Sequence, residues 1–196
     1  MYDSPNEKVI TKSSTIGKKS IVLTFDDGPS RLLPQFLDVL EKENVPAVFF
    51  WQSRFLTPNS PWQRVLGNGH KIGAHTVNHP NLAEMAYEEQ FEEIKQSIQT
   101  IEGITESPVR YFRPPYGRFN DDTLRAAAEL NVAPVMWKVA SMDWELENDP
   151  DQLIATVVDH LEDGAVILLH ELRQTLEALP QLIAAIKEKG YGFTLL

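Results

Sequence analysis

Seven short apolar runs, rich in β-branched and aromatic residues, alternate with segments of helical periodicity along most of this 196-residue chain. Runs of this length and composition are typical of buried strands. They span residues 21–25, 45–51, 71–74, 111–113, 132–137, 165–169 and 191–195. The predicted helices span residues 32–43, 62–68, 87–101, 121–130, 150–162 and 173–189. Strands that alternate with helices pair in parallel through right-handed crossovers, which leaves helices on the faces of the sheet.

The alternation predicts an α/β fold. We expect a closed barrel of parallel strands ringed by helices, with an open doubly wound sheet as the alternative. In both architectures ligands bind beyond the carboxyl ends of the strands. The predicted domain covers residues 21–196, and residues 1–20 are predicted to be a polar N-terminal segment or linker.

The bulk composition narrows the range of partners. A composition of 42% hydrophobic and 23% charged residues is typical of a soluble globular protein, and a net charge of −10 argues against nucleic acid as a partner. The absence of cysteine excludes disulfides and thiolate metal sites.

No apolar stretch approaches the roughly 18 residues of a membrane span, so no integral membrane segment is expected. Because the first 20 residues are polar, we expect an extracellular or cell-surface protein if a signal or anchor was removed, and a cytoplasmic one otherwise. The oligomeric state is not determined by the sequence.

Polar residues fall at the carboxyl ends of the predicted strands, where the fold would bring them together. Asp26 and Asp27 directly follow the first predicted strand, within the segment TFDDGP at residues 24–29. Adjacent carboxylates on a strand point in different directions, so one can bind a cation while the other faces a water molecule. The competing interpretation is an acidic turn formed with Gly28 and Pro29.

His75 and His79 follow the third predicted strand, four residues apart. On a helical turn this spacing places both imidazoles on one face, which suits zinc or a similar divalent ion. With Asp27 as a third ligand, one coordination position stays open for water, as in catalytic zinc sites. A structural role for the pair is the competing interpretation, and His70 and His160 have no comparable setting.

Arg113 ends the fourth predicted strand, beside the rigid proline pair at residues 114–115. Its guanidinium could hold Asp26 ionised and correctly aimed, although a lone arginine more often forms an ordinary surface ion pair. The backbone N–H of Tyr116 is a candidate donor to a developing oxyanion.

His170 follows the sixth predicted strand. A histidine there suits proton delivery to a leaving amine near neutral pH, and a structural histidine is the alternative. Trp144 and Leu168 are candidates for the apolar wall of a pocket, with core packing as the default for both.

Taken in order, the motifs resemble those of the polysaccharide deacetylases of carbohydrate esterase family 4. TFDDGP at residues 24–29 and HTVNHP at 75–80 are the specific parts. RPPY at 113–116, DW at 143–144 and LLH at 168–170 are shorter. The resemblance runs from about residue 21 to residue 196. It implies a distorted (β/α)7 barrel and an enzyme that removes N-acetyl groups from N-acetylglucosamine polymers such as chitin or peptidoglycan.

The resemblance also implies roles for the matching residues. Asp26 would be the general base, oriented by Arg113, and His170 would be the general acid. The Tyr116 amide would help to hold the oxyanion. Asp27, His75 and His79 would bind a divalent metal, Zn²⁺ first with Co²⁺ or Mn²⁺ as alternatives. Trp144 and Leu168 would line the pocket for the acetyl methyl group.

Two positions depart from the family pattern. The fourth motif usually reads D-x-x-D-W, with its first Asp paired to the catalytic histidine, and Ala140 stands in that place. We therefore expect His170 to lack charge stabilisation of its protonated form. The fifth motif usually ends in His-Asp, whereas Glu171 follows His170 here, and its longer side chain either keeps or loses the same contact. Some deacetylases acting on muramic acid residues resemble this variant fourth motif, so activity is still expected.

The leading hypothesis is a metal-dependent hydrolase that deacetylates an N-acetylglucosamine- or muramic acid-containing polysaccharide, such as cell-wall peptidoglycan or chitin oligomers. Ala140 motivates an alternative, a metal-containing glycan-binding module with little catalysis. A small-molecule amide hydrolase on the same scaffold is a third interpretation. A polymer substrate predicts an open groove with exposed aromatic residues, for which Trp51, Trp62 and Tyr116 are candidates.

Overall fold

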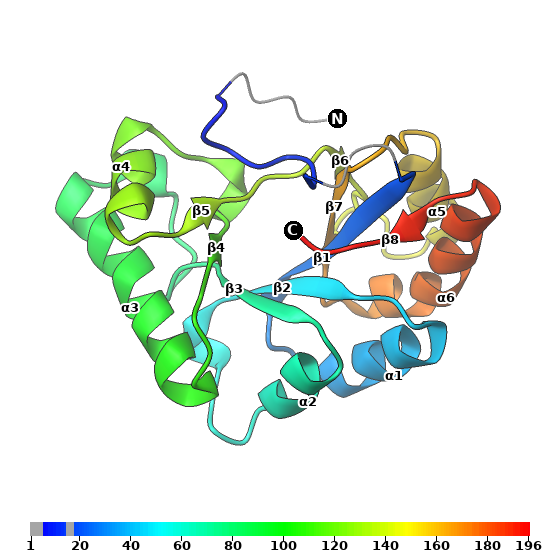
Figure 1. Ribbon diagram of the computed structural model, residues 1–196, viewed down its shortest axis with the longest axis horizontal. Helices are drawn as coiled ribbons and strands as arrows, with labels where there is room; N and C mark the ends of the chain where they lie inside the picture. Colours follow the sequence, from blue (N-terminus) through cyan, green and yellow to red (C-terminus); the bar gives the residue numbers. More distant parts are fainter. Residues whose placement is uncertain (1–5, 15–17) are drawn as a thin grey trace.

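The computed structural model describes residues 6–14 and 18–196, and its strands form one curled parallel sheet (Figure 1). Seven strands follow each other in the order β5-β4-β3-β2-β1-β7-β6, and β8 pairs with β1 outside this path. The strands are β1 (Ser20–Gly28), β2 (Ala47–Trp51), β3 (Lys71–Ala74), β4 (Tyr111–Phe112), β5 (Ala133–Pro134), β6 (Val139–Ala140), β7 (Val166–His170) and β8 (Gly192–Phe193).

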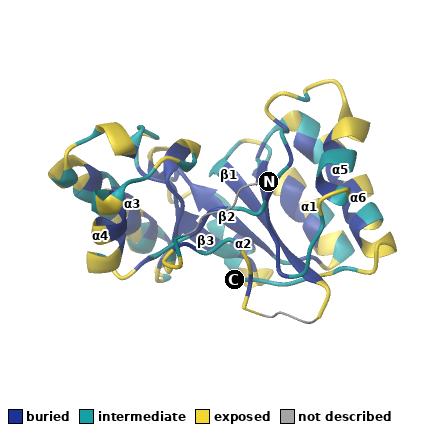
Figure 2. Ribbon diagram, turned by 90° about the horizontal axis from the view of Figure 1, so that it is seen from above, coloured by how far each residue is buried: buried dark blue, intermediate teal, exposed yellow. Residues whose placement is uncertain are grey.

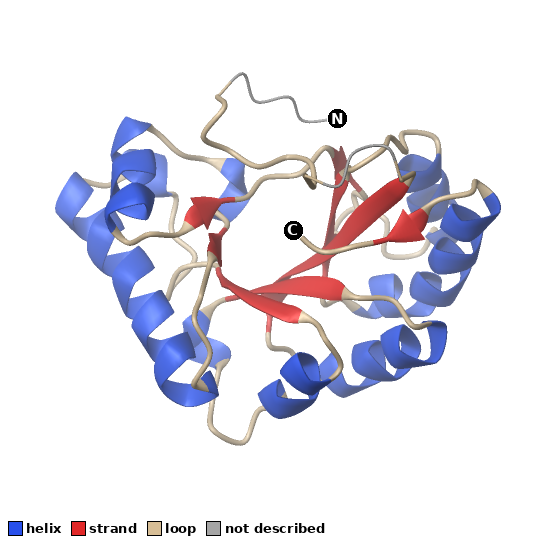
Figure 3. Ribbon diagram, in the orientation of Figure 1, coloured by secondary structure: helices blue, strands red, loops and turns tan. Residues whose placement is uncertain are grey.

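Helices surround the outside of the curled sheet (Figure 3). The α-helices are α1 (Leu33–Glu43), α2 (Trp62–Gly67), α3 (Tyr87–Thr105), α4 (Asp121–Glu129), α5 (Pro150–Val158) and α6 (Arg173–Glu188). Three short 3₁₀ helices are η1 (Ser53–Phe55), η2 (Leu82–Glu84) and η3 (Pro115–Gly117). The expected α/β fold, a distorted barrel of parallel strands ringed by helices, is confirmed.

The core lies between the sheet and the inner faces of the helices, as the burial colours of Figure 2 show. In α1, the buried residues Leu33, Phe36, Leu37 and Leu40 repeat at the spacing that gives a helix one apolar face. Phe36 meets Phe25 of β1 edge to face, with ring centroids 5.2 Å apart. The periodicity that predicts the helix in the sequence is therefore the feature that fixes it against the sheet.

The N-terminal segment, along its described residues, packs on the same body as the strands. Ile10 forms a parallel bridge with Val135, just after β5, and Lys12 forms an antiparallel bridge with Ala165, just before β7. Val9 is buried. Residues 6–14 thus connect the two sides of the curled sheet by backbone hydrogen bonds.

The boundaries of the short strands differ from those predicted. The run at residues 132–137 contributes only the two residues of β5, and β6 is a strand that the apolar pattern did not predict. Both strands are defined by their neighbours, since β5 pairs with β4 and β6 pairs with β7. Pairing of this kind is a tertiary property, so local propensity does not locate it. Among the described residues, no helix has the length and apolar character needed to cross a membrane.

His70 is a buried histidine beside the first residue of β2, at the opposite end of the strand from the strand-end motifs, and its surroundings keep it neutral. Its Nδ1 accepts a hydrogen bond from the backbone N–H of Ala47 at 3.1 Å. Burial, assisted by the positive charge of Arg64, lowers the pKa of His70 from 6.5 to about 4. His70 therefore acts in the fold, as its sequence setting suggests.

We predict that His70 makes the protein less stable as the pH falls from about 6.5 to about 4. In this window the unfolded chain binds a proton that the folded chain does not, so the free energy of unfolding decreases with falling pH. His70→Asn keeps an acceptor for the Ala47 N–H but does not titrate. Urea unfolding of both proteins at pH 7, 5.5 and 4.5 should show the variant losing less stability; parallel pH profiles would contradict the prediction.

Candidate active site

The motif residues meet at the carboxyl ends of the central strands. The register of β1 and β7 places Asp26 next to His170. A cavity of about 440 Å³ opens at this edge of the sheet. Its lining includes eight of the predicted site residues, namely Asp26, Asp27, His75, His79, Tyr116, Trp144, Leu168 and His170. The ninth, Arg113, lies beside the cavity and contacts Asp26.

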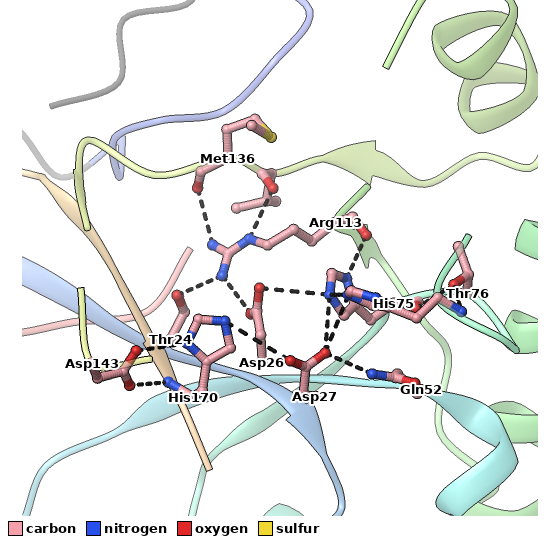
Figure 4. A network of polar contacts seen from close by, with 12 residues as sticks. Thr24, Asp26, Asp27, Gln52, His75, Thr76, Arg113, Met136, Asp143 and His170 are labelled. Atoms are coloured by element: carbon pink, nitrogen blue, oxygen red, sulfur yellow. Dashed lines mark hydrogen bonds and ion pairs between the residues drawn. The ribbon is translucent and has the colours of Figure 1, made fainter. Parts of the chain in front are cut away.

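A buried ion pair connects Asp26 to Arg113. Arg113 Nη1 donates to Asp26 Oδ1 at 2.6 Å and to Thr24 Oγ1 at 2.8 Å (Figure 4). Its Nε and Nη2 donate to the carbonyl oxygens of Val135 and Met136 at 3.1 and 3.0 Å. Burial lowers the pKa of the Arg113 guanidinium, while the charge and hydrogen bond of Asp26 oppose that shift. Arg113 is fully buried, so it does not form the ordinary surface ion pair that was the alternative for a lone arginine.

Asp27, His75 and His79 form a cluster with the geometry of a metal site. Asp27 Oδ1 lies 3.6 Å from His75 Nε2 and 3.3 Å from His79 Nε2, and the two imidazole nitrogens are 3.1 Å apart. Ligand atoms about 2.0–2.1 Å from a tetrahedral zinc ion lie about 3.3 Å from each other. The three donor atoms therefore fit a divalent ion with a further position facing the cavity.

The protonation states of the cluster favour a cation as well. His75 Nδ1 lies 2.7 Å from the Arg113 carbonyl oxygen, which can only accept, so Nδ1 carries the proton and Nε2 offers a lone pair. Burial and the neighbouring His75 lower the pKa of His79 from 6.5 to about 4. Burial raises the pKa of Asp27, but the charges of His75, His170 and His79 outweigh it and lower that pKa overall. A carboxylate oxygen and two imidazole nitrogens are the donor types that zinc prefers.

Backbone strain concentrates around the cavity. Five non-glycine residues of the site loops have a positive φ: Asp27 (69°), Thr76 (64°), His79 (62°), Tyr116 (57°) and Met142 (60°). For a β-branched residue such as Thr76 this conformation is a clear outlier. Such conformations persist only where surrounding contacts determine them, and they cluster at functional sites.

His170 has a carboxylate partner, which corrects the expectation drawn from Ala140. His170 Nδ1 lies 2.7 Å from Oδ1 of the fully buried Asp143, and its backbone N–H donates to Asp143 Oδ2 at 2.7 Å. Ala140 belongs to β6, beside Leu168, and the chain turns at Met142. This turn brings the second Asp of the fourth motif under His170, so the missing first Asp does not leave the imidazole unpaired.

The charge on His170 is favoured by these surroundings. Burial lowers the pKa of His170, but the hydrogen bond and charge of Asp143, with the charges of Asp26 and Asp27, outweigh burial and raise it. Asp143 also accepts from Thr175 Oγ1 at 2.6 Å, which fixes the carboxylate in place. The arrangement can hold a proton on His170 Nε2, the nitrogen that faces the cavity.

Glu171 does not repeat the contact of the usual Asp with the histidine. Its carboxylate accepts from Trp51 Nε1 at 3.1 Å and from the Ser30 backbone N–H at 2.7 Å. A Cβ on Gly28 would collide with the Glu171 carboxylate and lie 2.9 Å from the Trp51 ring, so a larger residue there would displace Glu171. The longer side chain therefore packs under the turn that follows Asp27, and burial raises the pKa of Glu171.

Aromatic side chains form the rim of the cavity. Tyr116 is 64% exposed and meets the His79 ring edge to face, with centroids 4.5 Å apart. Trp144 is 44% exposed and meets the His170 ring in the same way at 5.3 Å. Trp51, which the sequence suggested as an exposed aromatic, is fully buried, and Trp62 is half-buried against the core. Leu168 is buried at the cavity wall, so it serves both the core and the pocket.

Some residues at the site were not found from the sequence. Gln52 donates from Nε2 to Asp27 Oδ1 at 2.6 Å, and Trp137 lines the cavity. Neither belongs to a motif, so nothing in the chain marked them. Asp143 lay within a motif, but the resemblance gave the histidine contact to another position.

A protein-family model described as polysaccharide deacetylase matches residues 13–135 of this chain. The chitooligosaccharide deacetylase of Sinorhizobium fredii is 31% identical over 201 residues, covering 94% of this chain and 93% of that protein. The peptidoglycan-N-acetylglucosamine deacetylase of Bacillus cereus is 33% identical over 192 residues, covering 94% of this chain and 69% of that protein. The chain spans only 30% of the bifunctional xylanase/deacetylase of Pseudobutyrivibrio xylanivorans, to which it is 34% identical over 186 residues.

A solved structure with the same fold is that of a CE4 family pseudoenzyme from Bacillus anthracis. It has a TM-score of 0.88 and 30% sequence identity to this chain, and the match covers 97% of this chain and 67% of that one. The scaffold is therefore similar to proteins named as deacetylases and to one named as a pseudoenzyme.

We predict that Arg113→Met lowers the free energy of unfolding by about 3–5 kcal/mol, because it leaves the Asp26 carboxylate buried without its partner. The double variant Arg113→Met, Asp26→Asn should recover part of this loss, since no uncompensated charge remains. Urea denaturation of the metal-free proteins measures both. Equal losses in the single and double variants would show that the ion pair is not what stabilises this region.

Proposed function

Because this chain belongs to the polysaccharide deacetylase family, we propose that it is a metal-dependent hydrolase acting on N-acetylated polysaccharide. Its substrates would contain N-acetylglucosamine or muramic acid, as in cell-wall peptidoglycan or chitin oligomers. One observation carries the proposal: a cluster of metal-ligand character borders both a carboxylate held by Arg113 and an imidazole held by Asp143. This is the arrangement that amide hydrolysis by a base and an acid requires.

Asp27, His75 and His79 would hold the divalent cation, with Zn²⁺ as the first candidate and Co²⁺ or Mn²⁺ as alternatives. When bound, the cation supplies Lewis acidity, which polarises the amide carbonyl and makes water a stronger acid. The site residues described above fit this group, since their three donor atoms lie within 4.8 Å of one another.

Asp26 is the proposed general base. Its Oδ1 is bound by Arg113, which leaves Oδ2 to take the proton of the attacking water; Oδ2 lies 3.8 Å from His75 Nε2 and so is next to the metal cluster. The guanidinium pairs with Asp26 and fixes the direction of its free oxygen. The attack forms the new C–O bond and moves charge onto the carbonyl oxygen.

His170 is the proposed general acid. Its Nε2 lies 4.0 Å from Asp27 Oδ2, so the imidazole borders the metal cluster (Figure 4). It would donate its proton to the amide nitrogen as the C–N bond breaks, which releases acetate and leaves a free amine on the sugar. Asp143 stabilises the protonated imidazole and orients the ring, in the role that a carboxylate commonly takes beside a catalytic histidine.

The walls of the cavity supply the remaining functions. The two hydrogen bonds of the turn at η3 are donated by Gly117 and Arg118, so neither uses the Tyr116 N–H, which we propose as a donor to the oxyanion. Trp144 and Leu168 would surround the acetyl methyl group. The exposed rings of Tyr116 and Trp144 favour stacking on a sugar, which supports a glycan over a small-molecule amide.

A glycan-binding module with little catalysis is the second candidate, and the similarity to a CE4 family pseudoenzyme favours it. The same aromatic rim and metal cluster would serve binding alone. The contact of His170 with Asp143 argues for the enzyme, because a binding module has no use for a stabilised acid. Glycan affinity without acetate release, tested with Zn²⁺, Co²⁺ and Mn²⁺ in turn, would select the binding module.

We predict that Asp26→Asn abolishes acetate release from N-acetylglucosamine oligomers and from peptidoglycan, because the amide cannot take the proton of the attacking water. The variant should still bind zinc, since Asp27, His75 and His79 are unchanged. Acetate is measured by a coupled assay and bound zinc by mass spectrometry. Turnover that survives in the zinc-loaded variant would remove Asp26 as the base.

We predict that Asp143→Asn lowers kcat by about 10²–10⁴-fold, the usual contribution of general acid–base catalysis, because His170 loses the charge that stabilises its protonated form. Zinc content and the circular dichroism spectrum serve as controls. Ala140→Asp is the matched variant: it should leave kcat close to that of the unchanged protein, since Asp143 already binds His170 Nδ1. A large increase in kcat in Ala140→Asp would show that a carboxylate at position 140, and not Asp143, is what stabilises protonated His170.

A further inference from the structure

Gln52 touches the metal cluster from outside it. It follows β2 directly, and its side chain is only 4% exposed. Its Nε2 donates a hydrogen bond of 2.6 Å to Asp27 Oδ1, the oxygen that faces both imidazoles (Figure 4). Asp27 Oδ1 therefore accepts a hydrogen bond from the Gln52 amide and also faces the position that a divalent cation would occupy.

The orientation of the Gln52 amide is set by chemistry. An ionised carboxylate only accepts hydrogen bonds, so the NH₂ group must face Asp27 and the Oε1 atom must point away. Among the described residues, Oε1 is buried and has no hydrogen-bond partner. An unpaired buried carbonyl destabilises the fold, so the benefit of glutamine at this position has to lie at Asp27.

The backbone around Gln52 ties together the two loops that carry the metal ligands. The Gln52 N–H donates to the Gly28 carbonyl at 2.9 Å, one residue after Asp27. The Ser53 N–H donates to the Thr76 carbonyl at 3.1 Å, one residue after His75. Because the main chain at residues 52–53 is fixed to both loops, the amide meets Asp27 from a constant direction.

We propose that Gln52 is a positioning residue that makes Asp27 a metal ligand of fixed geometry. The side-chain N–H of Gln52 occupies one lone pair of Asp27 Oδ1. The other lone pair of this oxygen is left directed at the imidazoles of His75 and His79. The inference rests on the proposed function, since it assumes that the cluster binds a divalent cation. It adds a residue outside the recognised motifs to the support of the site.

The proposal can be tested because replacing Gln52 should affect the stability of the metal-free protein and its metal affinity in different ways. Gln52→Met has a similar length, removes the hydrogen bond and also removes the unpaired carbonyl. We expect the metal-free variant to be at least as stable as the unchanged protein in urea unfolding. Its zinc affinity, measured by competition with a chelator, should fall about 10–100-fold, as outer hydrogen-bond partners of metal ligands commonly show.

Gln90→Met is the matched control. Gln90 is also a fully buried glutamine, but both ends of its amide are satisfied, by the Met85 carbonyl and by the Thr123 hydroxyl. Its replacement should lower the stability of the metal-free protein and leave zinc affinity unchanged. The two variants therefore separate support of the fold from support of the metal.

Each other result has a defined meaning. Unchanged zinc affinity in Gln52→Met would overturn the proposal and leave the proposed function intact. A parallel loss of metal-free stability and zinc affinity would overturn it too, since Gln52 would then act through the fold. If the unchanged protein itself fails to bind zinc, Co²⁺ or Mn²⁺, the metal site of the proposed function fails, and the proposal fails with it.

Discussion

The buried ion pair between Arg113 and Asp26 is the interaction on which the site depends. The guanidinium binds the carboxylate, the Thr24 hydroxyl and two carbonyl groups after β5, while the Arg113 carbonyl accepts from His75. Arg113 thus connects the proposed base, a proposed metal ligand and the wall of the barrel. Burying a charge is unfavourable unless nearly all of its donors are used, and here four hydrogen bonds use them. The Phe50 ring lies 4.2 Å from the guanidinium carbon and completes its enclosure.

The carboxylates of the site follow a common plan. Asp26, Asp27 and Asp143 each have an oxygen held by a protein donor, namely Arg113, Gln52 and the His170 N–H. In Asp26 the oxygen that Arg113 leaves free lies next to the metal cluster, in Asp27 the bound oxygen itself faces both imidazoles, and in Asp143 the second oxygen contacts His170 Nδ1. Three acidic groups can therefore lie near one another with different tasks, because fixed donors decide which oxygen each one presents to its partner. The left-handed residues of the loops lie in the same segments, where surrounding contacts hold the strained backbone.

Much of the fold and the site could be predicted from the chain. The alternation of apolar runs and helical segments indicated the α/β barrel, and the position of Asp26, His75, Arg113 and His170 at strand ends indicated where they meet. The errors have physical causes. The partner of His170 was misassigned because a turn at Met142, with φ of 60°, decides which Asp of the fourth motif reaches the imidazole. Gln52 carries no motif, and its contact exists only because β1 and β2 are neighbours.

The sequence by itself determined the type of fold, the residues available for chemistry and their order, because periodicity and strand-end placement are local properties. The tertiary structure alone decided which atoms touch: that Asp143 replaces the carboxylate absent at Ala140, that Glu171 packs under the turn at Gly28, and that Trp51 is core. These outcomes depend on distances between segments far apart in the chain. Such distances follow from the register and packing of the whole barrel, which no single motif contains.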